Sequence, residues 1–280
     1  MRQIIQLIHS LFFSLGVCLV GKLLGSTGPV LQSGPVKMSL VCPSSGIVPN
    51  SITWIGWWIQ REEGWHTYWE HPGNVGLTPH LEWSVPAGLK VGNLQFPYPK
   101  RVQMAGVKAY GHHGNTLFLA KLEVPSLEVG TEVKLVAKAR WMVCSNVCLP
   151  EYNELSIILP VVESEVPDSD WQSRFGDFLK NRPLPVPRGW KLQAEELGKF
   201  TRLTISHPQE IFSKDVYFFG GSYLVCSDSK QPLRLENSQT EILLPKPPWS
   251  EENPTHLHGL LCVSGNDSLS TYYSIELPLE

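Results

Sequence analysis

The sequence predicts an all-β protein made of two β-sandwich domains in tandem, joined by a linker that contains one short helix. Segments with alternating apolar and polar residues recur about every 10 to 20 residues, as strands of a sandwich do. No long segment shows the period of an amphipathic helix. The 23 prolines and 23 glycines, spread over 280 residues, are typical of a chain with many turns.

Composition excludes several classes of function. Charged residues make up 18 % of the chain and the formal net charge is −3, so no basic surface for nucleic acid is expected. The sequence contains no phosphate-binding loop, dinucleotide fingerprint or ordered Ser-His-Asp set. We therefore expect neither a nucleotide-dependent enzyme nor a serine hydrolase.

Residues 1–26 are predicted to form a signal peptide or an N-terminal anchor. Arg2 precedes an apolar run from Ile4 to Val20, and the small residues Gly25 and Ser26 follow. No other stretch approaches the ~20 apolar residues that a membrane-spanning helix needs. The remainder is expected in an oxidising compartment outside the cytoplasm, either soluble or tethered by this N-terminal segment.

The first domain is expected over residues 34–162. It begins with a strand whose buried face alternates along the chain: Val36, Met38, Leu40 and Cys42. Cys42 has no close partner in sequence and is expected as a buried free thiol. The segment from Ser51 to Gln60, rich in Trp and Ile, predicts a second strand, and residues 117–124 and 133–143 predict two more.

The segment from Gly64 to Trp83 is dense in aromatic residues, histidine, proline and glycine. It is interpreted as an ordered loop with buried rings whose polar atoms are hydrogen-bonded. An alternative is a metal site formed by the histidines here and further along: His66, His71, His80, His112 and His113. Their spacing matches no compact metal-binding motif, and strand alternation is not expected to bring them together.

The stretch from Lys134 to Pro160 predicts a β-hairpin with Cys144 and Cys148 at its turn. Along one strand these cysteines would lie roughly 13 Å apart, too far for a disulfide. A chain reversal at Ser145 and Asn146 places them opposite each other, where Cα atoms lie about 4.5–5.5 Å apart and a disulfide fits. A bridgeable dithiol is therefore expected at an exposed loop tip.

The surroundings of this pair favour reactive sulfur. The basic residues Lys134, Lys138 and Arg140 precede it, and nearby positive charge favours thiolate over thiol. An apolar collar is expected from the neighbours Trp141, Met142 and Pro150. Two alternatives remain open: a structural disulfide in a non-catalytic binding module, or a copper- or zinc-handling protein that uses the same cysteines.

Residues 163–188 are expected to form a polar linker with a short helix, and residues 189–280 a second β-sandwich. The helix is expected to begin at an Asp170 N-cap and to place Trp171, Phe175, Phe178 and Leu179 on one face. It is interpreted as a docking helix between the domains. Cys226 and Cys262 both fall near the ends of predicted strands, and either pair with each other or lie buried as free thiols.

Several of these stretches resemble one family. The segments GWHTYWEHPGNVG, FPYP (residues 96–99) and RWMVCSNVCLPE are similar to the periplasmic N-terminal region of DsbD-type thiol:disulfide interchange proteins. The ScsB-like branch, with its Trp-X-X-Cys-X-X-X-Cys-X-Pro loop, is the most similar. VYFFGGS and HGLLCV extend the resemblance into the second domain. The family's long members continue into transmembrane helices and a thioredoxin-like domain, whereas the given sequence ends at Glu280. A stand-alone form is therefore expected, either served by a separate membrane reductant or acting as a binding module that lost its electron supply.

The resemblance implies immunoglobulin-like domains and a periplasmic location. It also implies that Cys144 and Cys148 form a redox couple that exchanges electrons with disulfide-carrying or thioredoxin-like partners, and with a separate membrane donor. Such a protein is a thiol–disulfide oxidoreductase or protein-disulfide reductase and needs no cofactor, although the residues alone do not establish enzyme activity. Family members also pack aromatic residues over the pair. Trp141 matches the family's motif, and Tyr68 and Tyr110 are further residues that could cover the pair. The order of attack and the direction of electron flow do not follow from the sequence.

Overall fold

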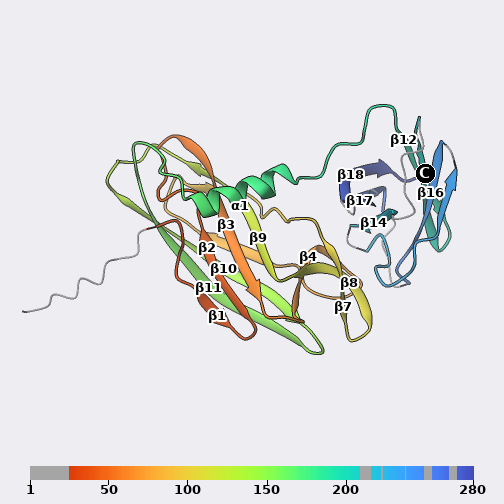
Figure 1. Ribbon diagram of the computed structural model, residues 1–280, viewed down its shortest axis with the longest axis horizontal. Coiled ribbons are helices and arrows are strands. Elements are labelled where there is room, and N and C mark those ends of the chain that lie inside the picture. Colours follow the sequence, from red (N-terminus) through yellow and green to blue (C-terminus); the bar gives the residue numbers. More distant parts are fainter. Residues whose placement is uncertain (1–24, 209–215, 222, 237, 249–253, 265–269) are drawn as a thin grey trace, which may run out of the picture.

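The computed structural model describes residues 25–208, 216–221, 223–236, 238–248, 254–264 and 270–280. The predicted signal or anchor therefore lies almost entirely outside the described residues. Within them the chain forms eighteen strands and one helix, so the all-β prediction is confirmed (Figure 1). No helix of the described part is both long and apolar enough to cross a bilayer.

The first sandwich consists of two antiparallel sheets that enclose one apolar core. One sheet has the order β1 (Leu31–Ser33), β2 (Val36–Val41), β3 (Ser51–Arg61), β9 (Asn115–Val124) and β6 (Lys90–Val91). The other has the order β11 (Cys148–Pro160), β10 (Glu132–Cys144), β4 (His66–Gly73), β8 (Val107–His113) and β7 (Lys100–Met104), with β5 (His80–Ser84) also paired to β10. The predicted inward face of β2 is confirmed, because Val36, Met38, Leu40 and Cys42 all lie in this core.

The aromatic segment from Gly64 to Trp83 is not simply a loop, since it forms β4 and β5. Its rings are buried as expected: Tyr68 is fully buried and Trp69 is nearly so. Residues 66–69 of β4 are all buried, so this strand lacks the alternating exposure by which a half-buried strand is predicted from sequence. The part that is a true loop, residues 74–79 between β4 and β5, is called the covering loop below.

The helix α1 (Ser169–Lys180) lies along the outer face of the first sandwich (Figure 1). The predicted apolar face is confirmed, because its Trp171, Phe175, Phe178 and Leu179 pack with Val41 and residues of β9. The N-cap is Asp168 rather than Asp170, and its carboxylate accepts hydrogen bonds from the backbone N–H groups of residues 170 and 171. The helix therefore packs mainly on the first sandwich, and is not a spacer placed between two domains.

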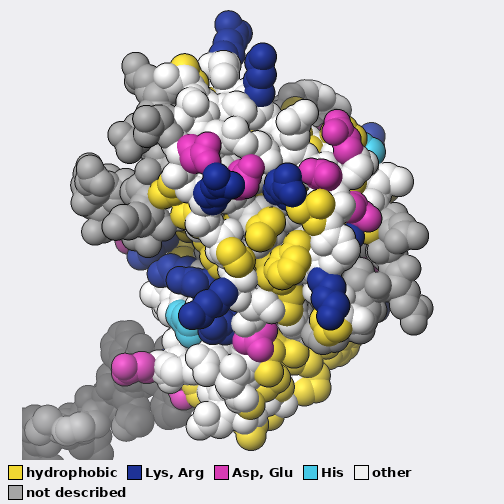
Figure 2. Space-filling model, turned by 90° about the vertical axis from the view of Figure 1, so that its right-hand side faces the viewer, with side chains coloured by type: hydrophobic (Ala, Val, Ile, Leu, Met, Phe, Trp, Pro, Cys, Tyr) yellow, Lys and Arg dark blue, Asp and Glu magenta, His cyan; other side chains and the backbone are white. Residues whose placement is uncertain are grey.

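The second sandwich also has two antiparallel sheets. One has the order β12 (Lys191–Leu197), β13 (Phe200–Ser206), β16 (Gln239–Pro245) and β15 (Leu233–Glu236), and the other the order β14 (Val216–Gly220), β17 (His256–Ser264) and β18 (Ser270–Pro278). The strand β15, with the sequence LRLE, is short and largely exposed. Seen from this end of the molecule, basic and acidic side chains both surround a central group of apolar ones (Figure 2).

An aromatic cluster joins the two sandwiches. It is formed by residues of β4, the segment before β7, β8, β14, β17 and β18: Trp69, Phe96, Tyr98, Tyr110, Tyr217, Phe219, Leu260, Cys262 and Tyr272. Tyr98 stacks on Tyr272 with ring centroids 3.9 Å apart, and the hydroxyl groups of Tyr110 and Tyr217 lie 3.2 Å apart. The β4, β8 and β7 end of the first sandwich therefore faces the second sandwich (Figure 1).

Candidate functional site

The long hairpin of β10 and β11 brings Cys144 and Cys148 together. The strands pair in register over their whole length, from Glu132 opposite Pro160 to Cys144 opposite Cys148. A three-residue turn closes the hairpin, with the Ser145 N–H donating to the Val147 carbonyl at 2.9 Å. The two sulfurs form a disulfide with an S–S distance of 2.03 Å and Cα atoms 4.2 Å apart, which confirms the predicted bridge.

The two cysteines differ in their access to solvent. Cys144 is fully buried, because β10 is also paired with β4 at this point and Cys144 lies opposite His66. Cys148 begins the edge strand β11 and is only half-buried, beside a Val147 side chain that is 57 % exposed. The expectation of an exposed dithiol is therefore wrong for Cys144 and holds in part for Cys148.

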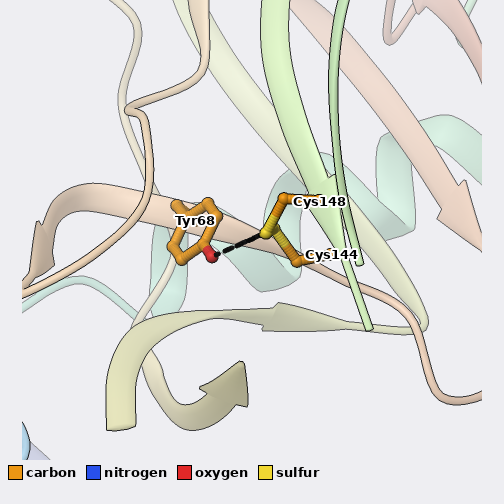
Figure 3. The surroundings of a disulfide bond; sticks show 3 residues. All are labelled: Tyr68, Cys144 and Cys148. Atoms are coloured by element: carbon orange, nitrogen blue, oxygen red, sulfur yellow. Dashed lines mark hydrogen bonds between the residues drawn. A yellow bond between two sulfur atoms is a disulfide. The ribbon is translucent and has the colours of Figure 1, made fainter. Parts of the chain in front are cut away.

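Tyr68 of β4 covers the disulfide. Its hydroxyl donates a hydrogen bond to the Cys144 sulfur at 3.1 Å and lies 3.9 Å from the Cys148 sulfur (Figure 3). Burial raises the pKa of Tyr68 to about 12, so the hydroxyl keeps its proton at neutral pH and remains a donor. Of the two tyrosines that the sequence left open, Tyr110 lies instead in the aromatic cluster between the sandwiches.

The apolar collar differs from the expected one. Trp141 is an odd number of residues from Cys144, so strand alternation turns it into the core, where its ring meets Trp57 at 6.1 Å. Met142 does lie beside the sulfurs. The other apolar neighbours of the pair come from β4, the covering loop, β7 and β8: Tyr68, Val75, Val102, Met104 and Ala109.

The expected cationic setting is also absent from the immediate surroundings. Arg140 is the nearest of the three basic residues, and four residues along a strand place its Cα roughly 13 Å from that of Cys144. Its side chain instead lines a cleft of about 540 Å³ beside the hairpin. Other walls of this cleft come from the covering loop and β11, including Leu77, Pro150 and Tyr152.

A buried histidine lies directly across from Cys144. His66 is 1 % exposed, and its ring centroid lies 5.3 Å from that of Tyr68 and 5.6 Å from that of His113. Burial, and secondarily the charges of His113 and Arg61, lower the pKa of His66 to about 4, so its imidazole is neutral at pH 7. The sequence did not predict that His66 lies beside the disulfide, although the i, i+2 spacing places His66 and Tyr68 on the same face of a strand.

The histidines pair up rather than forming one cluster. His66 meets His113, contrary to the expectation that strand alternation would keep these residues apart, and His71 meets His258 with ring centroids 5.5 Å apart. Among the described residues, no group of three or more His, Cys, Asp or Glu side chains is arranged to hold a metal ion.

The other three cysteines of the described residues, Cys42, Cys226 and Cys262, are free and buried. Burial raises the pKa of Cys42 to about 11, and the expectation of a buried thiol at this position is confirmed. Cys226 and Cys262 do not pair, which decides between the two alternatives left open. Cys226 is not in a strand but in the segment between β14 and β15, where it meets the covering loop of the first sandwich.

Fold and site together define a tandem β-sandwich protein with a disulfide at the end of a hairpin, covered by a tyrosine. Residues 43–160 match the family described as thiol:disulfide interchange protein DsbD, N-terminal. This part of the chain is therefore a domain of the DsbD N-terminal type, and the resemblance noted in the sequence is confirmed.

Among solved structures, the N-terminal periplasmic domain of ScsB from Proteus mirabilis is similar in fold, with a TM-score of 0.64 at 15 % identity. The match covers 91 % of this chain and 99 % of that one, so both sandwiches are included. A protein of unknown function from Porphyromonas gingivalis W83 matches at 11 % identity over 88 % of this chain and 100 % of its own, but its TM-score of 0.23 is too low to indicate a shared fold. No curated protein matches the sequence.

Proposed function

We propose that the protein is a periplasmic thiol–disulfide exchange protein that relays electrons through Cys144 and Cys148. The observation that carries the proposal is the disulfide itself, which lies at the end of a hairpin in a DsbD N-terminal-type domain and joins one partly exposed cysteine to one fully buried cysteine. Residues 1–26 would export the chain or anchor it. The partners would be disulfide-carrying or thioredoxin-like proteins, with a separate membrane protein as electron donor.

The geometry favours attack on Cys148. A partner thiolate needs an in-line approach to one sulfur, and only Cys148 is half-exposed. Attack breaks the Cys144–Cys148 bond, forms a mixed disulfide between Cys148 and the partner, and releases Cys144 as a thiolate. The Tyr68 hydroxyl already donates to the Cys144 sulfur, so it would stabilise the leaving thiolate.

A second thiolate of the partner then attacks the partner's own sulfur in the mixed disulfide. The partner leaves oxidised, Cys148 is released as a thiolate, and both cysteines take up protons from solvent. Two electrons have moved to the pair. In the reverse direction the Cys148 thiolate attacks an oxidised partner, and Cys144 resolves the mixed disulfide. The chemistry needs no cofactor.

The rival function is a binding module in which the same disulfide only stabilises the hairpin, and the full burial of Cys144 favours it. A bridge over three intervening residues closes a very short loop, so the chain-entropy relation gives it only about 2 kcal/mol. The hairpin is also held along its whole length by the backbone pairing of β10 with β11. Reduction is therefore expected to leave the sandwich folded, as a reversible redox centre requires.

A single-cysteine trapping experiment tests the proposal. The C144S variant keeps the accessible Cys148 thiol and should accumulate a partner as a mixed disulfide, visible on a non-reducing gel and identifiable by mass spectrometry. The matched C148S variant keeps, of the pair, only the buried Cys144 thiol and should trap little. In the wild type, alkylation after mild dithiol treatment should add a mass shift for two thiols. A pair that stays closed under conditions that reduce thioredoxin-like proteins would overturn the proposal.

A further inference from the structure

The covering loop, residues 74–79, contacts the site and the second sandwich at once. On the site side, Val75 packs in the apolar cluster with Tyr68 and Cys144. The Gly76 backbone, with φ of 110°, lies so close to Tyr68 that a Cβ atom at this position would overlap the ring. Tyr68 is therefore held between the disulfide on one side and the covering loop on the other.

Asn74 ties the start of the same loop to the second sandwich. Its side-chain Nδ2 donates to the Cys226 sulfur at 3.0 Å, and its Oδ1 accepts the Ser227 N–H at 3.0 Å. Its own backbone N–H donates to the Ser227 hydroxyl at 2.9 Å. Ser227 is 1 % exposed, so these bonds are shielded from competing water.

The attachment point on the second sandwich is itself fixed to the first. The Ser227 hydroxyl donates to the Lys108 carbonyl of β8 at 2.8 Å, and the Lys108 N–H donates to the Asp228 carboxylate at 3.0 Å. The aromatic cluster lies next to these bonds, since Tyr110 belongs to the same strand. The segment 226–228 therefore bridges β8 and the covering loop.

We propose that Asn74 is a positioning residue for disulfide exchange, and that the second sandwich acts through it to hold Tyr68 over the Cys144–Cys148 pair. The inference rests on the proposed exchange function. Cys148 is only partly exposed, and Tyr68 and Val75 of the covering loop pack against the pair. Movement of Tyr68 and the covering loop would widen the approach of a partner sulfur to Cys148, and the three bonds of Asn74 oppose that movement. The second sandwich then sets how often the disulfide becomes accessible.

The test follows reduction of the native, oxidised protein by dithiothreitol, quenched by alkylation and read by mass. At high dithiothreitol concentration the rate of disulfide reduction reaches a plateau, because opening of the covering loop then limits the reaction. The N74A variant removes two side-chain hydrogen bonds, so its plateau is expected about tenfold above that of the wild type. N74D keeps the acceptor for the Ser227 N–H but loses the donor to Cys226, and should fall between the two.

Two controls separate positioning from general loosening. Asn181 also uses its amide, donating to the Asp177 carbonyl at 2.8 Å at the end of α1, so N181A should leave the plateau unchanged. The F175A variant loosens the packing of α1 far from the loop, and should lower Tm without a matching rise in the plateau. If N74A does not fold, S227A removes the acceptor of the Asn74 N–H and takes its place.

The outcomes distinguish the two proposals. A wild-type disulfide that dithiothreitol does not open in the folded protein overturns the exchange function. If dithiothreitol reduces the wild type, and N74A and S227A are reduced at the same plateau rate as the wild type, the role of Asn74 is overturned and the exchange function stands. A plateau that rises in F175A as much as in N74A would assign the effect to lost stability and also overturn the inference.

Discussion

The pairing of a buried sulfur with a tyrosine hydroxyl decides what each cysteine can do. Cys144 has no exposed surface and has a hydrogen-bond donor, whereas Cys148 has exposed surface and lies 3.9 Å from the same donor. A leaving group needs stabilisation and an attacked sulfur needs access. Tyr68 therefore makes the pair chemically unequal, although the cysteines face each other at one position of a symmetrical hairpin.

Replacing Tyr68 by Phe keeps the ring over the disulfide and removes only the donor. Because a hydrogen bond to a charged group is usually worth more than one between neutral groups, we expect attack on Cys148 to slow by about tenfold. The second-order rate with a small dithiol at low concentration measures this. Y273F, a matched change in the second sandwich, serves as the control. An unchanged rate in Y68F would mean that the hydroxyl does not assist departure of Cys144.

At this scale the sequence predicted the bridge and only part of its surroundings: Met142 as a neighbour on the same strand, and Tyr68 through the family resemblance alone. A spacing of four residues with a turn former between them fixes a Cys–Cys pairing locally. The partner residues come from β4, about 76 positions away from Cys144 in the chain, and no local pattern links Tyr68 to that sulfur. The wrong side assigned to Trp141 was avoidable, since three residues along a strand always reverse the face.

At the scale of elements, α1 acts as a third layer on the first sandwich. Phe175 is 2 % exposed and reaches Gly56 of β3, where a Cβ atom would lie only 2.8 Å from its ring. The glycine thus creates the space that the phenylalanine fills. The helix was predictable because Trp171, Phe175, Phe178 and Leu179 recur at helical spacing, whereas its surface of contact was not, because that depends on a glycine over a hundred residues away.

Truncating Phe175 to Ala should destabilise the first sandwich by about 3–5 kcal/mol, the usual cost of removing a buried phenylalanine. Urea unfolding followed by tryptophan fluorescence gives the free energy of unfolding. Phe178 is only half-buried in the same cluster, so F178A should cost clearly less and provides the comparison. Equal, small losses in both variants would show that α1 is not packed on β3 and β9 as described.

At the scale of the whole molecule, the two sandwiches are joined by aromatic rings and by the bonds around Ser227. The contributing residues lie in segments that are distant in the chain, and each segment by itself reads as an ordinary strand or turn. For that reason the presence of two sandwiches could be predicted from the sequence, whereas the residues that form the interface between them could not. The histidine pair His71 and His258 spans this same junction.

Acid should destabilise the molecule, because three histidines of the described residues, His66, His71 and His112, are held neutral by burial. Burial lowers the pKa of His66 and of His71 to about 4, with nearby positive charge as the lesser cause, whereas unfolded histidine titrates at about 6.5. As pH falls from about 6.5 to 4, the unfolded chain takes up protons first, so stability is present above this window and is lost within it. The His66 difference alone corresponds to at most about 3 kcal/mol.

Urea unfolding at pH 7.5, 5.5 and 4.5 checks this expectation, and the H66Q variant should show a shallower decline. A free energy of unfolding that is the same at pH 7.5 and pH 4.5 would contradict it. Exchange rates measured in parallel would separate loss of the fold from any direct effect of protonation on the sulfurs.

The in-register hairpin has a consequence for reoxidation. Because β10 and β11 are paired in register from Glu132 and Pro160 up to the turn, we expect this pairing to keep the two thiols of the reduced protein neighbours. Bond formation then needs no search through chain conformations, and each thiol meets the other at the high effective concentration of an intramolecular reaction. A mixed disulfide on Cys148 would accordingly be short-lived, so the identity of the oxidant and its rate of encounter would govern how fast the protein returns to its oxidised form.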